Sequence, residues 1–152
     1  MGCTGFDGYL YYNTGTDASP VFVEVDTVRD VNTAGATDKA DVSDRRSKFK
    51  KSCPAMIDLE TSVTATYVQG NVAMDAIRDQ FLARTAVQFY ILDGPAVPAS
   101  GDTSEGWAFY AAVYSNDFNQ PLSDGQNVSF TLSPMDSVAD PVEPQWFTVS
   151  TA

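Results

Sequence analysis

The stretch from Ile57 to Val68 reads IDLETSVTATYV, and it decides the fold prediction because apolar and polar residues alternate along it. A period of two is typical of a β-strand with one buried and one solvent-facing side. The apolar side holds Ile57, Leu59, Val63, Ala65 and Tyr67. The polar side holds Asp58, Glu60, Ser62, Thr64 and Thr66. The pattern therefore predicts a sheet that presents carboxylates and hydroxyls to solvent.

A basic segment, DRRSKFKKS at Asp44–Ser52, lies just before this strand. Between residues 39 and 51, six bases stand against two acids, which gives +4. The remaining residues carry 18 acids against three arginines, which gives −15 and a net charge of −11. This large excess of acidic residues outside the basic segment disfavours nucleic-acid binding, because such binding depends on lysine and arginine to displace counterions.

An aromatic residue stands inside this basic segment, a combination that favours docking against an acidic neighbour. The residues expected at such a docking contact are Arg45, Arg46, Lys48, Phe49, Lys50 and Lys51. Two alternatives remain open, namely a solvated loop without a partner and a small phosphate-binding patch.

The rest of the 152-residue chain predicts a mainly β (α+β) fold, a β-sandwich or open barrel of six to seven strands in one domain over 1–152. One flanking helix is expected at about 71–84, capped by Asn71, with apolar residues at helical spacing. Residues 30–52 have no stable period and are predicted to form a long loop. The other expected strands are Gly8–Tyr12, Val21–Val25, Val87–Leu92, Trp107–Tyr114, 128–132 and Trp146–Val149.

Common catalytic and metal-binding groups are scarce. The chain has no histidine, which excludes Ser-His-Asp and Cys-His catalysis, and its two cysteines, Cys3 and Cys53, are expected to be reduced thiols. Asp58 and Glu60 share a wet strand face, whereas acid–base catalysis needs one carboxyl of a pair in an apolar pocket. We expect no enzyme, cofactor or metal, with a calcium site at Asp102, Glu105 and Asp124 as the alternative. No signal peptide or membrane-spanning run is recognisable.

Seven segments, in this order, resemble the tail tube proteins of long-tailed bacteriophages. They are TGFDGYLYYNTG at 4–15, VEVDTVRDV at 23–31, DVSDRRSKFKKS at 41–52, IDLETSVTATY at 57–67, AIRDQFLARTAVQFYILDGP at 76–95, PLSDGQNVSFTL at 121–132 and PQWFTV at 144–149. None is a catalytic fingerprint, and their joint order carries the resemblance.

The resemblance implies a structural virion protein without the C-terminal immunoglobulin-like domain that some members carry. Six such subunits close into a ring around a channel, and rings stack into a tube that conducts DNA from capsid to host. The polar residues of the 57–68 strand are then candidates for the channel lining. Residues 30–52 correspond to a loop that orders on stacking, which puts the six docking residues at a subunit or ring contact. Implied partners are further copies of the chain, the tail tip, the tail terminator and the tape-measure protein. The implied location is the virion tail, assembled in the bacterial cytoplasm.

A second hypothesis is a monomeric ligand- or carbohydrate-binding β-sandwich. Its stacking platform would come from surface aromatics, for which the candidates are Tyr11, Tyr12, Trp107 and Trp146. Such a module would be stabilised by a soluble ligand, whereas a tube subunit would not.

Overall fold

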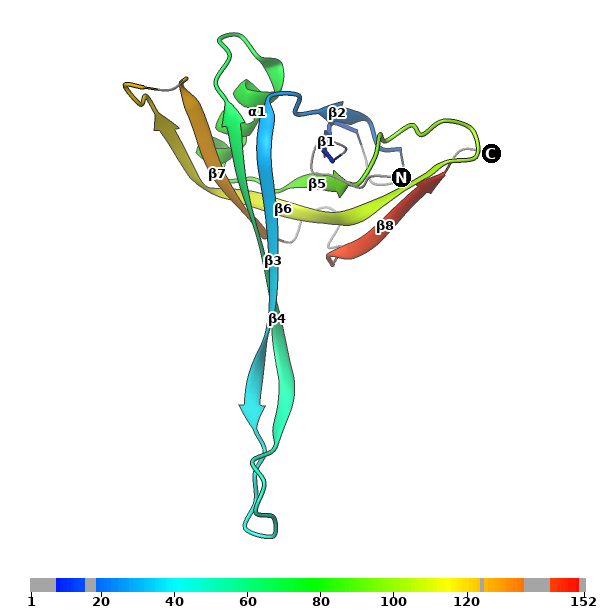
Figure 1. Ribbon diagram of the computed structural model, residues 1–152, viewed down its shortest axis with the longest axis vertical. Coiled ribbons are helices and arrows are strands. Elements are labelled where there is room, and N and C mark those ends of the chain that lie inside the picture. The colour runs from blue at the N-terminus through cyan, green and yellow to red at the C-terminus, as the bar shows by residue number, and fades with distance from the viewer. Residues whose placement is uncertain (1–7, 16–18, 124, 136–142, 151–152) are drawn as a thin grey trace.

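The computed structural model describes residues 8–15, 19–123, 125–135 and 143–150. In these residues, eight strands form one antiparallel sheet and a single helix packs beside it (Figure 1). The prediction of a mainly β fold with one helix is confirmed. The elements are β1 (Tyr9–Asn13), β2 (Phe22–Glu24), β3 (Val28–Asp41), β4 (Ser52–Thr66), α1 (Val72–Ala83), β5 (Val87–Leu92), β6 (Thr103–Asn119), β7 (Asn127–Pro134) and β8 (Gln145–Ser150).

The strand order is β2-β1-β5-β6-β7-β4-β3, with β8 paired to β6. The long strand β6 pairs with β5 on one side, and with β8 and then β7 on the other. The two edge strands of this order, β2 and β3, are consecutive in sequence and joined by only three residues. The sheet therefore curls into an open barrel, because a short connection holds its two ends near each other (Figure 1).

The main core fills the concave side of the sheet. Alternate residues of β4, β5, β6 and β7 point into it, as the period-two pattern requires. The most enclosed large side chains there are Val63, Phe89, Phe109, Phe130 and Leu132, each at most 1% exposed. Burial of one such side chain stabilises the fold by about 1.5–3 kcal/mol. The core thus fixes which face of β4 is polar.

A second apolar cluster lies on the opposite face of β1, β5 and β6. It comprises Tyr11, Tyr90, Leu92, Ala96 and Ala108, with Phe22 and Phe147 packed against it. The buried backbone N–H of Ala96 donates a hydrogen bond to the Tyr11 hydroxyl at 3.1 Å. Burial raises the pKa of Tyr11, because desolvation disfavours the phenolate. This part of the sheet is therefore covered on both sides.

At Gly106 the backbones of neighbouring strands approach closely. It lies on β6 between Leu92 of β5 and Phe147 of β8. A Cβ atom at this position would stand 1.7 Å from the carbonyl oxygen of Ile91. Only glycine is compatible with this strand spacing.

The helix prediction is confirmed at both ends. The side-chain oxygen of Asn71 accepts a hydrogen bond from the Met74 N–H, which satisfies one of the free donors of the first turn. Arg84 ends the helix in the left-handed conformation, with φ of 60°. Ala73, Met74 and Ile77 are buried against the core.

The prediction of a loop over 30–52 is wrong for most of that segment. β3 continues to Asp41 and pairs with β4 down to Asp41↔Ser52, so only 42–51 connects the two strands. With β3 the sheet has eight strands, one more than the upper limit of the prediction. The outer half of β3 is exposed on both faces, and a pattern of burial therefore does not mark it as a strand.

Candidate assembly surfaces

The β3–β4 hairpin projects from the body as a long arm (Figure 1). Leu59 is the outermost buried residue of β4, at 5% exposed, and it pairs with Gly35. Beyond this pair every residue from 36 to 58 is exposed except the half-buried Ser47. We call residues 36–58 the hairpin arm. Its strands are held by the backbone ladder and make no core of their own.

The arm is irregular at one point in its ladder. The register shifts between Thr37↔Ile57 and Lys39↔Pro54, so that Asp38 faces two residues of β4. Such a β-bulge increases the local twist and bends the strand that carries it. The two strands cross in projection along the arm in Figure 1.

The tip of the arm, residues 42–51, is ordered by short-range hydrogen bonds. The Val42 N–H donates to the Lys51 carbonyl at 3.1 Å, and the Lys51 N–H donates to Ser43 Oγ at 2.8 Å. Asp44 Oδ1 accepts from the Arg46 N–H at 3.0 Å. Hydrogen bonds from the Ser43 hydroxyl and backbone N–H lower the pKa of the Asp41 carboxyl, so this acid at the base of the tip stays ionised.

All six residues predicted for a subunit contact lie together at this tip. Arg45, Arg46, Lys48, Lys50 and Lys51 are exposed, and Phe49 is 79% exposed. The described residues contain one salt bridge, Arg78–Asp75, so none of the tip cations is paired within this part of the chain. A dense group of unpaired cations around an exposed phenyl ring is suited to an acidic partner with an apolar floor.

The five polar residues predicted to line a channel share one face of β4. Asp58, Glu60, Ser62 and Thr66 are exposed and Thr64 is half-buried. Asp58 lies on the arm, and the other four lie over the body. Thr61, on the opposite face, was not assigned from the sequence; it is 0% exposed, and its hydroxyl lies 3.2 Å from that of Thr33.

The same polar face extends across three further strands, which the sequence did not reveal. Residues paired across strands share a face. The hydroxyl residues of β4 pair with polar residues of β3 or β7, and those β7 residues pair with polar residues of β6. The Ser115 hydroxyl donates to Thr131 Oγ1 at 2.9 Å, and Asn119 Nδ2 donates to Asn127 Oδ1 at 3.1 Å. The added residues are Asp30, Asn32, Ser115, Asp117, Asn119, Asn127, Ser129 and Thr131. We call the thirteen residues together the four-strand polar face; it holds four carboxylates and no base.

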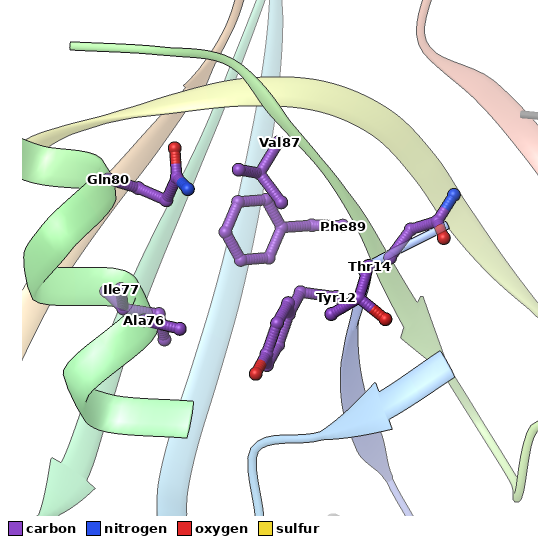
Figure 2. Close-up of a pocket in the computed structure, with 8 residues that line it drawn as sticks. Tyr12, Thr14, Ala76, Ile77, Gln80, Val87 and Phe89 are labelled. Carbon is purple, nitrogen blue, oxygen red and sulfur yellow. The ribbon is translucent and has the colours of Figure 1, made fainter. Parts of the chain in front are cut away.

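A hollow of about 360 Å³ lies between α1 and the ends of β1 and β5 (Figure 2). The rings of Tyr12 and Phe89 face the helix side chains Ala76, Ile77 and Gln80 across it. Its lining contains no carboxylate and no basic group. It therefore lacks a pair of groups for acid–base chemistry.

The surface aromatics proposed as a sugar-stacking platform do not form one. Tyr11 and Tyr12 are buried, at 8% and 7% exposed. Trp107 is half-buried and contacts Trp146 edge to face, with ring centroids 5.5 Å apart. Only Trp146 of the four is exposed, and its Nε1–H donates to Glu105 Oε2 at 3.4 Å. The prediction was wrong because Tyr11 and Tyr12, as neighbours on β1, point to opposite faces of the sheet, and each is buried in one of the two apolar clusters.

No group of three potential metal ligands occurs in the described residues, which include Asp102 and Glu105 of the alternative calcium site, while Asp124 lies outside them. Cys53 is an exposed free thiol on the arm, and Cys3 lies outside the described residues. The helix found in this part of the chain is too short or too polar to span a membrane.

No protein-family model matches the chain, and no curated protein matches it in sequence. Solved structures do match it in fold. A chain of the SPP1 tail tube superposes with a TM-score of 0.74 at 12% identity, over 97% of this chain and 80% of that one. A chain from the tail of an empty gene transfer agent particle, computed with C6 symmetry, has a TM-score of 0.66 at 12% identity, over 98% of both chains.

A more distant match comes from the six-fold symmetrised baseplate of the anti-feeding prophage, with a TM-score of 0.51 at 9% identity over 94% of this chain. At such identities the likeness establishes the fold and leaves the residues at each surface to be assigned from this chain itself. The chain therefore shares its fold with a chain of the SPP1 tail tube and with a chain of the gene transfer agent tail.

Proposed function

We propose that this chain is a structural tail tube subunit that assembles into hexameric rings, and that the rings stack into a conduit for genome delivery into a host. The observation that carries this proposal is the likeness to the SPP1 tail tube over 97% of the chain. The six-fold symmetry of the gene transfer agent tail and of the anti-feeding prophage baseplate supports a ring of six.

The sheet edges support assembly between copies. β3 carries fourteen residues along an outer edge that pairs with no other described strand, and short β2 ends the sheet on the other side. Unpaired edges are sites at which another chain adds to a sheet. Closing a ring through such edges would satisfy their backbone groups in every subunit at once.

We assign the channel wall to the four-strand polar face, including Asp58, Glu60, Ser62, Thr64 and Thr66. Over the body its other side is the apolar core, and all four of its carboxylates are exposed. Its four carboxylates and lack of bases would repel phosphate groups, and DNA would pass without binding. The hydroxyl and amide groups would keep the wall hydrated.

We assign the arm tip, with Arg45, Arg46, Lys48, Phe49, Lys50 and Lys51, to a contact between subunits or rings. Its cations lack acidic partners within the described residues, and the rest of the chain carries −15. The arm holds these cations away from the body of their own subunit, so acidic partners for them would come from a second molecule. Further partners of the tube would be the tail tip, terminator and tape-measure proteins, in the virion tail assembled in the bacterial cytoplasm.

Negative-stain electron microscopy of the concentrated protein, at low and moderate salt, tests this function. Six-fold rings or stacked tubes are the expected result. A protein that stays monomeric at every concentration and salt, and that stays monomeric when mixed with tail tip complexes, would refute it.

A further inference from the structure

The hairpin arm is a two-stranded ribbon with two free edges. β7 pairs with β4 only at 61–66, and β3 is the last strand of the sheet order, so neither edge of the arm meets another described strand. Every β4 residue from 52 to 58 is exposed. A long exposed strand edge is a template for a further chain, and the contact of a β3 edge with a β4 edge repeats without closing. The shape of the arm therefore offers a route to open-ended stacking into fibres.

The β4 half of the arm also has a composition that favours such stacking. Residues 52–57 read SCPAMI and contain no charged side chain, and Met56 and Ile57 are 80% and 76% exposed. Short, uncharged, exposed segments are prone to cross-β pairing, and charged residues or prolines interrupt it. The facing part of β3, residues 37–41, includes three charged residues. The β4 edge lacks this protection, so protection there has to come from its backbone.

Pro54 removes the donor that its position would offer to a further strand. The Val42 N–H donates to the Lys51 carbonyl directly opposite, and antiparallel pairs alternate from there between hydrogen-bonded and non-hydrogen-bonded. Lys39↔Pro54 is the third pair beyond this one, so its backbone groups point outward. Proline has no N–H, and an outward-facing edge position is one of the few in a sheet that tolerates it. Pro54 therefore breaks no bond of the arm ladder and takes a donor from its free edge.

A β-bulge directly follows Pro54 on the same strand, where Ala55 and Met56 stand opposite Asp38 alone. A bulge interrupts the regular spacing of donors and acceptors along an edge and increases the local twist. A straight incoming strand would therefore find no donor at Pro54 and no regular repeat in the two residues that follow. Three successive residues of the β4 half of the arm thus oppose pairing.

We propose that Pro54 and the Ala55–Met56 bulge form an edge guard, which keeps the arms of free subunits from pairing strand to strand into fibres. The edge guard acts on β4 alone. The outer edge of β3 over the body, residues 28–35, stays open to an ordered partner. The inference concerns the free subunit, and it does not depend on whether rings form.

Removal of both features tests the edge guard. Pro54→Thr restores the outward donor, and deletion of Met56 restores one-to-one pairing with β3. Both faces of the arm are exposed at these positions, so the shift of register loses no packing. We expect this combined variant to form thioflavin-T-positive fibres at a concentration at least tenfold below any at which the wild type does so. The matched control, Pro121→Thr with deletion of Leu122, makes the same changes in the exposed turn between β6 and β7 and should behave like the wild type.

A proline on the opposite edge identifies the strands that pair. The Lys39 N–H points outward, so Lys39→Pro removes a donor from the β3 edge without breaking a bond of the arm ladder. Added to the combined variant, Lys39→Pro is expected to abolish the fibres. Lys39→Ala removes the same charge and keeps the N–H, so it should leave the fibres in place. Electron microscopy distinguishes fibres from rings or tubes.

Circular dichroism and melting temperature show whether each variant is folded. A folded combined variant that stays as free of fibres as the wild type would overturn the inference. Fibres that persist with Lys39→Pro, or that the turn control also forms, would overturn it too, because they would arise from another segment. The single variant Pro54→Thr keeps the chain length and gives the same comparison if the combined variant does not fold. Rings or tubes of the wild type bear on the proposed function alone.

Discussion

Reversal of the charge at the arm tip separates assembly from folding most sharply. The variant Arg45→Glu/Arg46→Glu/Lys50→Glu/Lys51→Glu changes the segment 39–51 from +4 to −4. All four side chains are exposed, and none forms an ion pair among the described residues. The fold therefore loses no packing and no salt bridge when the charges are reversed.

The size of the effect follows from the exposure of the four cations. An exposed ion pair contributes about 0.2–1 kcal/mol, and reversing one partner replaces the attraction by a repulsion of similar size. Each reversal then costs about 1 kcal/mol at the contact, and four cost about 4 kcal/mol. At about 1.4 kcal/mol per factor of ten, the association constant falls by about a thousandfold.

Sedimentation and electron microscopy over a concentration series measure this loss, and thermal unfolding reports the fold. Single exposed substitutions change stability by about 0.5 kcal/mol or less, so the melting temperature is expected to stay within a few degrees of wild type. A matched pair of double variants controls for net charge. Arg45→Glu/Lys50→Glu should weaken assembly, whereas Arg78→Glu/Arg84→Glu, on the helix and its cap, should leave it nearly unchanged.

The reasoning predicts a salt dependence as well. Screening over about 10 Å at 0.1 M salt weakens exposed charge pairs, so wild-type assembly through the tip should decline as salt rises. Tubes of the fourfold variant at the wild-type threshold concentration would refute an interface role for these cations. A large fall in melting temperature would instead show that the tip stabilises the fold.

Three further predictions concern the channel wall and the core. Asp58→Lys/Glu60→Lys should spare tube formation and lower phage infectivity more than tenfold, because a basic wall binds DNA; a normal titre would contradict the assignment. Gly106→Ala should destabilise the fold by more than about 3 kcal/mol in urea unfolding, since a Cβ atom overlaps a neighbouring carbonyl oxygen; a wild-type midpoint would show that the strands can separate. Tyr11→Phe should cost about 1–3 kcal/mol, because it leaves the buried Ala96 N–H without its acceptor. The raised pKa of Tyr11 means that the unfolded chain loses this proton first, so stability should fall above about pH 10 in the wild type and fall less in the variant.

Sequence reasoning succeeded where burial leaves a periodic pattern. Val87–Leu92 is β5 with the predicted bounds, and Asn71 caps α1 as predicted. Both elements pack against the main core, so their apolar residues recur at the spacing of a strand or a helix. The polar face of β4 was predictable for the same reason, since Leu59, Val63 and Ala65 fix the opposite face inside.

The arm could not be predicted in this way. From Ala36 to Asp41 every residue of β3 is exposed, and the strand exists because its backbone pairs with β4. Backbone pairing leaves no hydrophobic period, so the sequence revealed the cations and Phe49 but not the structure that presents them. The wider polar face was missed for a related reason, because it depends on register across β3, β4, β7 and β6.

The continuity of β4 has a mechanical consequence. This strand runs unbroken from Ser52, next to the arm tip, to Thr66 in the body, where it is bonded to β3 on one side and β7 on the other. Antiparallel ladder bonds lie perpendicular to the strands, so a pull on the tip along the arm loads the ladder between β4 and β7 in shear. A joint made at the tip is thus anchored directly in the hydrophobic core, and tension along a stack of such subunits would be borne by the sheets rather than by flexible loops.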